Sequence, residues 1–293
     1  VTGSAQARAA VLRTIGAPLT LEEITLAPLA PDQVRVRIAA SGVCHSDLSQ
    51  ATGVLPAGTP CVLGHEGAGV IEEVGAQIRH VQPGDHVAVA WIASCGRCWY
   101  CQRGEVHLCR NAIRDAYSMP YADDATGTAL FTSMGVSSFA TATNCLGRAV
   151  VKIDDDIPLD IAALVGCGVA TGAGAALNTA PVQHGSAVAV IGLGGVGLAA
   201  VMGARVRGAA AIIGVDPVAS RRETALELGA THVVDAGADD VIAAIKALTG
   251  RRGADIVFEA VGRAATIETA FAATRPGGTT CVVGAASTTE QIS

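Results

Sequence analysis

The sequence is poor in charged residues, and basic residues are the scarcer kind. Charged side chains make up 16% of its 293 residues, and the net charge is −6. This balance argues against nucleic acid or an anionic membrane as the main partner. Half of the residues are hydrophobic, which indicates a folded chain and excludes a disordered one. The length favours two domains, each large enough to bury its own core.

A secretion signal is also missing from the start of the sequence. Residues 1–6 are small and polar, without a basic start or an apolar core. The uncharged run 187–204 is about long enough to cross a membrane, but four glycines within residues 192–197 indicate a strand, a tight turn and a helix. We therefore expect a cytoplasmic protein with no membrane partner.

The sequence changes character near residue 160. Before that point, short alternating segments at residues 34–40, 70–74 and 87–90 predict a small β-rich barrel with loops. After it, strands alternate with helices, which predicts a parallel sheet covered on both faces. The expected domains are 1–160 and 161–293. The expected strands of the second are 187–191, 211–215, 233–234, 255–258 and 280–283, and the expected helices are 196–207, 220–228, 240–248 and 266–273.

A glycine-rich loop follows the first of these strands and opens a helix. Its sequence is Gly192-Leu193-Gly194-Gly195-Val196-Gly197, and Asp216 closes the next strand. Gly192 permits the tight turn, Gly194 lets a pyrophosphate approach the backbone, and Gly197 lets the helix pack on the strand. The free N–H groups and partial positive charge of the helix N-terminus favour phosphate. The pattern predicts a dinucleotide site.

Asp216 selects the cofactor in this interpretation. Its carboxylate can accept both ribose hydroxyls of NAD and would repel the 2′-phosphate of NADP. The alternative is that Asp216 only caps the helix that begins near Pro217. Arg221 could reach the same ribose or could simply be an exposed helical arginine.

Four cysteines lie close together in the pattern Cys95-x2-Cys98-x2-Cys101-x7-Cys109. Four thiolates at this spacing suit a closed tetrahedral structural zinc site, and Gly96 and Gly104 let the loop fold around the ion. An iron–sulfur cluster has similar ligand needs, but the spacing of the fourth cysteine favours zinc. His107 lies inside the loop and is expected to be solvated.

The remaining candidate ligands show no local metal-binding spacing. Cys44 begins Cys44-His45-Ser46-Asp47, His65 lies in Gly64-His65-Glu66-Gly67, and Cys167 lies in Gly166-Cys167-Gly168. The residues alone leave a shared site as one possibility among others.

Several motifs together resemble the zinc-dependent medium-chain alcohol dehydrogenases. Residues 64–75 (GHEGAGVIEEVG) are similar to the zinc signature of that family. The Cys44–Asp47 segment, the cysteine quartet, Gly166-Cys167-Gly168 and the glycine loop follow in the family's order. The resemblance covers essentially the whole chain. It implies an α/β protein with a β-rich GroES-like catalytic domain followed by a doubly wound Rossmann domain.

The resemblance also implies roles for individual residues. It implies a catalytic zinc ion on Cys44, His65 and Cys167, and thus two zinc ions per chain, with NAD as the second cofactor. Asp47 matches the residue that orients the histidine ligand, Glu66 a carboxylate that can approach the metal, and Ser46 the hydroxyl that takes the alcohol's proton. Cofactor contacts are implied for His45, Thr171, Val196 and Val283. Cys61, Cys145 and Cys281 match no ligand position and are expected to pack in the core.

Three features depart from the family pattern. Ser49 stands where many members have a histidine that ends the proton relay, and His45 stands where an arginine is common. The family also continues beyond the position of Ser293, so we expect a Rossmann domain truncated at its C-terminus. A protein that ended there would have an open sheet edge and is not expected to form the family dimer. A homo-oligomer is expected only with the C-terminal segment.

The expected reaction is hydride transfer between a primary alcohol, or an aldehyde, and NAD. A dehydrogenase of a formaldehyde–thiol adduct shares every motif above. A non-catalytic fragment that binds zinc and nucleotide is an alternative of another class, whereas the intact ligand set argues against a zinc-free quinone reductase. The sequence does not identify the alcohol.

Overall fold

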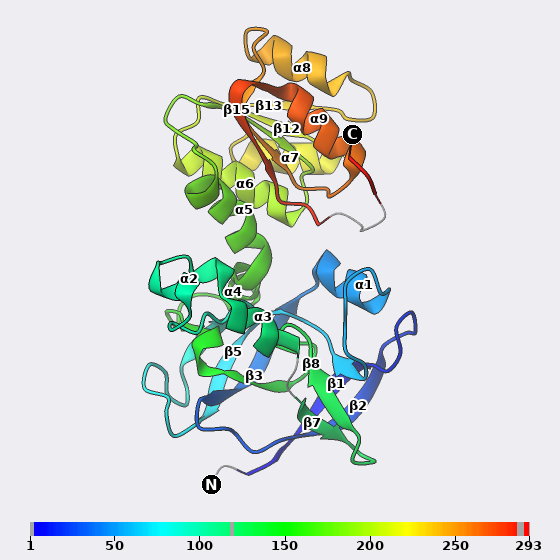
Figure 1. Ribbon diagram of the computed structural model, residues 1–293, viewed down its shortest axis with the longest axis vertical. Helices are drawn as coiled ribbons and strands as arrows, with labels where there is room; N and C mark the ends of the chain where they lie inside the picture. Colours follow the sequence, from blue (N-terminus) through cyan, green and yellow to red (C-terminus); the bar gives the residue numbers. More distant parts are fainter. Residues whose placement is uncertain (1–2, 118–119, 286–289, 293) are drawn as a thin grey trace. The chain divides into compact units, whose positions relative to one another are not determined.

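The computed structural model describes residues 3–117, 120–285 and 290–292 of the chain (Figure 1). The chain divides into two compact units, Val1–Cys167 and Gly168–Ser293. The boundary expected at residue 160 falls inside helix α4 (Leu159–Leu164), and the division lies further along the chain, directly after Cys167.

A closed barrel forms one part of the first unit. Strand β1 alternates small apolar residues with exposed polar ones, so that Ala7, Ala9 and Val11 are buried while Gln6 and Arg8 are exposed. This period of two supplies the inward face of the barrel. The barrel order is β1 (Ala5–Leu12), β2 (Thr20–Leu26), β7 (Pro120–Asp124), β8 (Ala129–Thr132) and β4 (Cys61–Val62).

An antiparallel sheet forms the rest of the β structure in this unit. Val34, Val36, Ile71, Val87 and Val89 are its buried core residues. The alternating segments predicted from the sequence all lie in this sheet. Its order is β10 (Val150–Lys152), β6 (His86–Val89), β5 (Glu66–Val74), β3 (Gln33–Gly42) and β9 (Ala142–Leu146).

Short helices connect these strands. Helix α1 (His45–Ala51) begins at Cys44, whose backbone is extended and whose N–H donates to the Asp47 carboxylate. This local bond satisfies a backbone donor at the helix start. The other short segments are α2 (Trp99–Gln102), η1 (Val106–Leu108), α3 (Arg110–Tyr117) and η2 (Gly147–Ala149).

The second unit is built on a five-stranded sheet in which every neighbouring pair is parallel. The order reverses at β11, as in a doubly wound fold. Its strands, from edge to edge, are β13 (His232–Val234), β12 (Ala211–Val215), β11 (Ala187–Ile191), β14 (Ala254–Glu259) and β15 (Thr274–Val282). Strand β15 starts earlier than predicted, because a register shift at its start lets it continue through Pro276 and two glycines.

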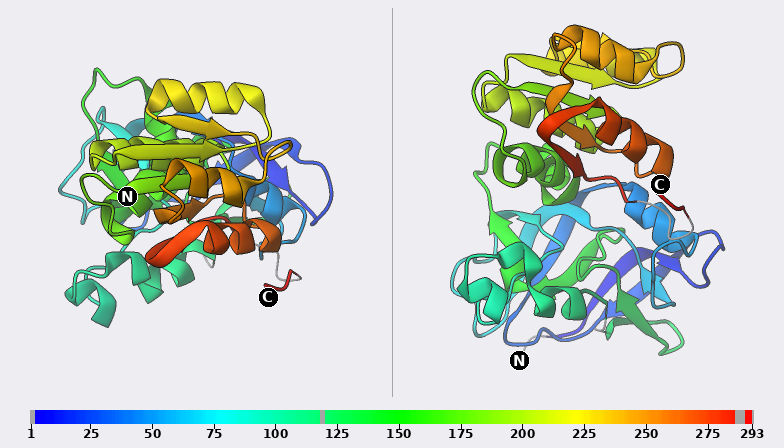
Figure 2. Two further views of the ribbon diagram at one scale, coloured as in Figure 1. Left: turned by 90° about the horizontal axis from the view of Figure 1, so that it is seen from above. Right: turned by 45° about the horizontal axis from the view of Figure 1, so that its top comes forward.

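Helices cover both faces of this sheet (Figure 2). Val188 and Val190 of β11 pack with α6 on one face, whereas Ala189 and Ile191 pack with α8 and α9 on the other. Strands buried on both sides in this way are typical of parallel sheets. The helices are α6 (Gly195–Val206), α7 (Ala219–Leu228), α8 (Val241–Leu248) and α9 (Ala264–Ala273).

A helical run at Leu159–Thr179 was not expected from the sequence. It has the length and apolar composition of a membrane span, and 28% of its most apolar window is buried. Ala162 and Ala163 pack in a core cluster of the first unit, and Ala175 and Ala176 in one of the second. Its segments after α4 are η3 (Val165–Val169), α5 (Ala170–Gly174) and η4 (Ala175–Thr179).

Candidate active site

Four potential metal ligands from distant parts of the first unit meet at one point. The ligand atoms of Cys44, His65, Glu66 and Cys167 all lie within 4.8 Å of one another. Cys44 precedes α1, His65 precedes β5, and Cys167 lies in the helical run. The fold thus assembles the set that the family resemblance implied.

Asp47 fixes the first part of this cluster. Its Oδ1 accepts the N–H of Gly64 at 3.1 Å and lies 3.0 Å from His65 Nδ1, while Oδ2 accepts the N–H of Cys44 at 3.0 Å. Because a carboxylate only accepts, His65 Nδ1 carries the proton and Nε2 carries the free lone pair. Asp47 is itself 2% exposed, so this arrangement is fixed deep inside the unit.

The free nitrogen of His65 faces the cysteines. His65 Nε2 is buried and has no hydrogen-bond partner among the described residues. A buried, unpaired nitrogen is costly unless a ligand completes it. Burial lowers the pKa of His65, but the hydrogen bond with Asp47 and the sulfur of Cys44 raise it more, to about 9. The surroundings of the ring therefore favour a positive charge at Nε2, either a proton or a metal ion.

Cys44 is prepared as a thiolate. Its sulfur is stabilised by a hydrogen bond with Cys167; burial opposes ionisation, and His65 and Ser46 stabilise the anion further, so that its pKa falls to about 3. Two cysteine sulfurs, which bind zinc as thiolates, and an imidazole nitrogen form a donor set that suits zinc. The residues fit a zinc ion.

Two glycines lie in close contact with residues at the cluster. A Cβ atom at Gly42 would lie 2.1 Å from Glu66 Oε2, and one at Gly166 would lie 2.3 Å from the carbonyl oxygen of Val89. Gly166 therefore requires glycine at the observed backbone distance, whereas a larger residue at position 42 would displace the Glu66 carboxylate. Gly166 holds the helix against β6, which places Cys167 beside His65.

The cysteine quartet forms a second and separate cluster. The sulfur atoms of Cys95, Cys98, Cys101 and Cys109 lie within 4.8 Å of one another. Cys98 Sγ is 3.5 Å from Cys101 Sγ and 3.9 Å from Cys109 Sγ. Tetrahedral zinc with Zn–S bonds of about 2.3 Å requires sulfur atoms about 3.8 Å apart. These distances fit a structural zinc ion.

Local residues support the quartet as the sequence predicted. Gly96 and Gly104 have φ of 69° and 80°, which are left-handed conformations. The backbone N–H of Arg97 lowers the pKa of Cys95 to about 6, and the Asn111 amide donates to the same sulfur at 3.2 Å. His107 is exposed, in agreement with the expectation that it is solvated.

The glycine loop of the second unit has the geometry of a phosphate cradle. Gly192 turns with φ of 91°, and a Cβ at Gly197 would lie 1.8 Å from the carbonyl oxygen of Gly192. A Cβ at Gly194 or Gly195 would meet no atom within 4 Å, so open space lies over the loop at the N-terminus of α6. A pyrophosphate fits at this position.

Asp216 is fixed at the end of β12. It is 3% exposed; its Oδ2 accepts the N–H of Leu193 and its Oδ1 that of Val218, both at 2.9 Å. Arg221 Nη1 lies 3.5 Å from Oδ2. Asp216 thus joins the glycine loop to the start of α7. Oδ2 accepts from Leu193 and Arg221, whereas Oδ1 accepts only from Val218 among the described residues and can accept a second hydrogen bond.

The other predicted residues lie in varied surroundings. His45 is exposed on α1 of the first unit, and Thr171 is exposed on α5 of the second. Val196 is half-buried on the first turn of α6, and Val283, also half-buried, donates its N–H to Glu259 at 2.8 Å. Ser49 is half-buried in α1.

Two of the three cysteines outside the clusters are buried in the core, as predicted. Cys61 and Cys145 are buried, whereas Cys281 of β15 is only half-buried. Burial raises the pKa of Cys61 to about 11 and that of Cys145 to about 12, so both are neutral thiols at neutral pH.

Sequence reasoning missed Glu259, which ends strand β14 with a side chain that is 0% exposed. An acidic residue that closes an apolar strand beside the glycine-loop strand is a signal that could have identified it.

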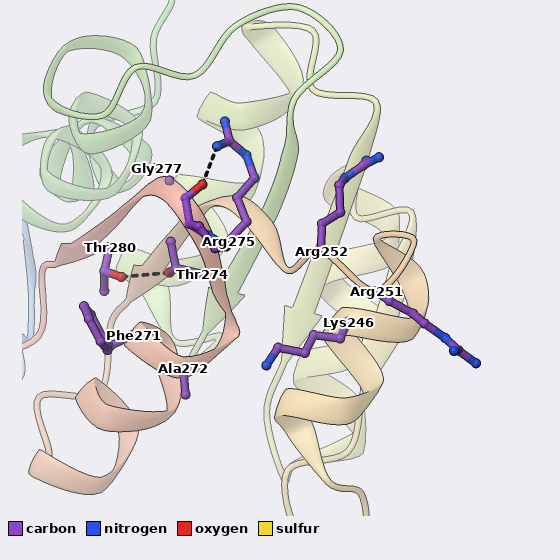
Figure 3. A pocket seen from close by; sticks show the side chains of 11 residues that line it. Lys246, Arg251, Arg252, Phe271, Ala272, Thr274, Arg275, Gly277 and Thr280 are labelled. Carbon is purple, nitrogen blue, oxygen red and sulfur yellow. Dashed lines mark hydrogen bonds between the residues drawn. The ribbon is translucent and has the colours of Figure 1, made fainter.

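A separate cavity of about 780 Å³ lies in the second unit beside β15 (Figure 3). Lys246, Arg251 and Arg252 line it, but Figure 3 shows that their charged ends diverge. None of the predicted site residues lines this cavity, and diverging cations form no common anion site.

Comparison with known proteins agrees with this geometry. The family model described as an alcohol dehydrogenase GroES-like domain matches residues 30–155, and that of a zinc-binding dehydrogenase matches residues 195–293. Geraniol dehydrogenase from Castellaniella defragrans is 41% identical over 286 residues, 95% of this chain and 76% of that protein. S-(hydroxymethyl)glutathione dehydrogenase from Saccharomyces cerevisiae is 39% identical over 97% of this chain and 77% of its own length.

A solved structure supports the same assignment. The crystal structure of benzyl alcohol dehydrogenase from Acinetobacter calcoaceticus matches with a TM-score of 0.90 and 35% identity, over 99% of this chain and 80% of that one. The two family models, the relatives and the two cysteine clusters agree. The chain therefore belongs to the zinc-dependent medium-chain alcohol dehydrogenase family and is an alcohol oxidoreductase that uses zinc and NAD(P).

Proposed function

We propose that the protein is an NAD-linked dehydrogenase of primary alcohols and the corresponding aldehydes, with two zinc ions per chain. The observation that carries this proposal is the buried, unpaired Nε2 of His65, directed by Asp47 toward Cys44 and Cys167. Cys44, His65 and Cys167 would hold the catalytic ion. The quartet at residues 95–109 would hold the structural one.

The chain's own residues have distinct tasks at this site. A zinc ion held there supplies Lewis acidity for the oxygen of an alcohol or aldehyde. Asp47 binds Nδ1 of His65 and so directs Nε2, the ligand nitrogen, toward the cysteines. Ser46, whose hydroxyl interacts with the Cys44 sulfur, would take the alcohol's proton. Ser49 is no base near neutral pH, so the proton leaves through water or another group.

The dinucleotide supplies the hydride acceptor, and Asp216 is the basis for proposing NAD over NADP. Two backbone N–H groups hold its carboxylate, so it cannot turn away from a 2′-phosphate. A fixed negative charge at that point repels the phosphate but accepts ribose hydroxyls. Arg221 forms an ion pair with Asp216 at 3.5 Å, but its side chain is 54% exposed and solvent screens its charge.

The substrate proposal draws on two relatives whose names give chemically similar alcohols. Geraniol and benzyl alcohol are both primary alcohols whose hydroxyl carbon adjoins an unsaturated carbon. We propose this class, allylic and benzylic primary alcohols, as the substrates. The yeast relative, at 39% identity, makes S-(hydroxymethyl)glutathione the second candidate.

A cytoplasmic location and a homo-oligomeric assembly remain predictions.

A panel of substrates with both cofactors tests this proposal. We expect NAD to be preferred over NADP by about 10²-fold in kcat/KM, since a misplaced charge is rejected strongly. Cinnamyl and benzyl alcohol should exceed ethanol and S-(hydroxymethyl)glutathione in kcat/KM. Asp216→Gly should reduce the NAD preference, with Glu223→Gln, an exposed change on α7, as the control. Equal turnover with NAD and NADP in the unaltered enzyme would refute the role of Asp216.

A further inference from the structure

The strongest unassigned feature is the buried carboxylate of Glu259. It is 0% exposed, and its Oε1 accepts the N–H of Val261 at 3.0 Å, the N–H of Gly262 at 2.9 Å and the hydroxyl of Thr266 at 2.7 Å. Its Oε2 is buried without a hydrogen-bond partner among the described residues. Burying this side chain has a desolvation cost, and the hydrogen bonds at Oε1 offset part of it. Two of these bonds come from the backbone of the loop that follows β14.

That loop, residues 260–262, packs against the glycine loop. A Cβ at Gly192 would lie 2.6 Å from Val261 Cγ2 and 3.2 Å from the carbonyl carbon of Ala260. The first glycine of the dinucleotide motif therefore rests directly on the loop that Glu259 holds. A displacement of this loop would displace Gly192.

The same loop also touches the segment after β15. A Cβ at Gly284 would lie 2.2 Å from the N atom of Gly262, and one at Gly262 would lie 2.6 Å from the carbonyl oxygen of Ala285. The carbonyl oxygen of Glu259 accepts the N–H groups of Val283 at 2.8 Å and Gly284 at 3.0 Å. Glu259 therefore binds one loop through its side chain and another through its backbone.

The register of the sheet explains why one residue can do this. Ile191, Glu259 and Val282 are aligned at the carboxyl ends of β11, β14 and β15. Dinucleotides bind beyond the carboxyl ends of such strands. The N–H of Ala260 also donates to Ile191 at 2.8 Å, just before Gly192. Glu259 lies beneath the point where the three loops meet.

We propose that Glu259 is a positioning residue for the dinucleotide. It fixes the spacing between the glycine loop and the segment Val283–Ala285 by holding the loop between them. This inference rests on the proposed use of NAD at the glycine loop. It concerns cofactor affinity, because the three loops all belong to the second unit, whereas the zinc ligands belong to the first.

The test compares Glu259→Ala, Glu259→Gln and the exposed control Glu227→Gln in the zinc-loaded enzyme. NADH affinity is measured by fluorescence titration, alongside KM for NAD, KM for benzyl alcohol and zinc content. Glu259→Ala should weaken NADH binding and raise KM for NAD about 10-fold to 10²-fold, because small misplacements of a binding loop are costly. KM for the alcohol should stay within about twofold, and zinc content should be unchanged. Glu259→Gln keeps the Oε1 acceptor and should recover most of the lost affinity.

The results that would overturn the role of Glu259 differ from the result that would contradict the proposed function. Glu259→Ala with unchanged NADH affinity overturns the positioning role, as does an equal rise in both KM values. If Glu259→Ala does not fold, Thr266→Val removes one donor to Oε1 and should weaken NADH binding about threefold, the effect of one lost hydrogen bond. Unchanged NADH binding in Thr266→Val then overturns the role. Failure of the unaltered enzyme to bind NADH contradicts the proposed function instead.

Discussion

The two cysteine clusters of the first unit are built in opposite ways. The quartet comes from one loop, residues 95–109, and its cysteines recur at short intervals. The cluster of Cys44, His65 and Cys167 comes from three segments that only the folded sheet and the helical run bring together. Local cysteine spacing determines the first site, whereas the tertiary fold determines the second.

The difference concerns what each site needs from the rest of the chain. The quartet lobe has little packing of its own, since Trp99, Val106 and Leu108 are exposed. A bound ion would therefore contribute much of its folding energy. The other cluster lies in a preformed setting that Asp47, Gly42 and Gly166 maintain. There, the metal should add reactivity more than it adds stability.

Cys167→Ser should have the largest effect on activity. Losing one thiolate of the catalytic set removes the Lewis acid at the alcohol oxygen, so kcat/KM should fall by about 10³-fold or more. Zinc content should fall from two ions to one per chain, and the unfolding temperature should change little. The measurements are steady-state kinetics, elemental analysis and thermal unfolding. Cys145→Ser, at a buried cysteine outside both clusters, is the matched control.

Cys98→Ser should lower stability more than activity, the reverse of Cys167→Ser. The variant loses the structural ion and with it a stabilisation on the order of several kcal/mol, since metal binding and folding are coupled in such lobes. We expect the unfolding temperature to fall by more than about 10 °C. Hydrogen exchange should rise across residues 95–109. If Cys98→Ser unfolds at the temperature of Cys167→Ser, the two sites do not differ as argued.

Asp47→Asn should have an intermediate effect. Asparagine has one accepting oxygen where aspartate has two, so its NH₂ group faces either His65 or the N–H of Cys44. Disturbing the partner of a ligating histidine typically costs about 10-fold to 10²-fold in metal affinity or activity. Zinc affinity is measured by chelator competition, with the exposed Asp156→Asn as the control. Equal chelator resistance in both variants would show that Asp47 does not orient His65.

The contrast between the two sites also explains which features could be predicted from the sequence. The quartet, the glycine loop and Asp216 carry their chemistry in local patterns, and the structure places them close to the predicted geometry. From β11 to α9 the strands and helices of the second unit were predicted to within about two residues, because buried parallel strands alternate clearly with helices. The helical segments before β11 and the first six residues of β15 were missed.

The nonlocal features could not be predicted from the residues alone. Cys167 lies in a helical run, but Gly166-Cys167-Gly168 shows no helical pattern, since packing against Val89 and not propensity fixes its backbone. None of the five barrel strands was predicted, including β1 with 8 residues and β2 with 7. Glu259 carries no motif, and its importance follows only from three strands that end in register.

Trp99→Ala should have the smallest effect and tests whether the metal or packing holds the quartet lobe. Trp99 is 63% exposed, and the Arg103 guanidinium lies 4.6 Å from the centre of its ring. An exposed cation–π contact contributes about 0.5–1 kcal/mol. We therefore expect a fall of about 2–4 °C in unfolding temperature, with activity and zinc content unchanged. Arg103→Gln should match it, because both remove the same contact. A loss as large as that of Cys98→Ser would mean that this aromatic contact, not the four thiolates, holds the lobe together, and the contrast between the two clusters would then fail.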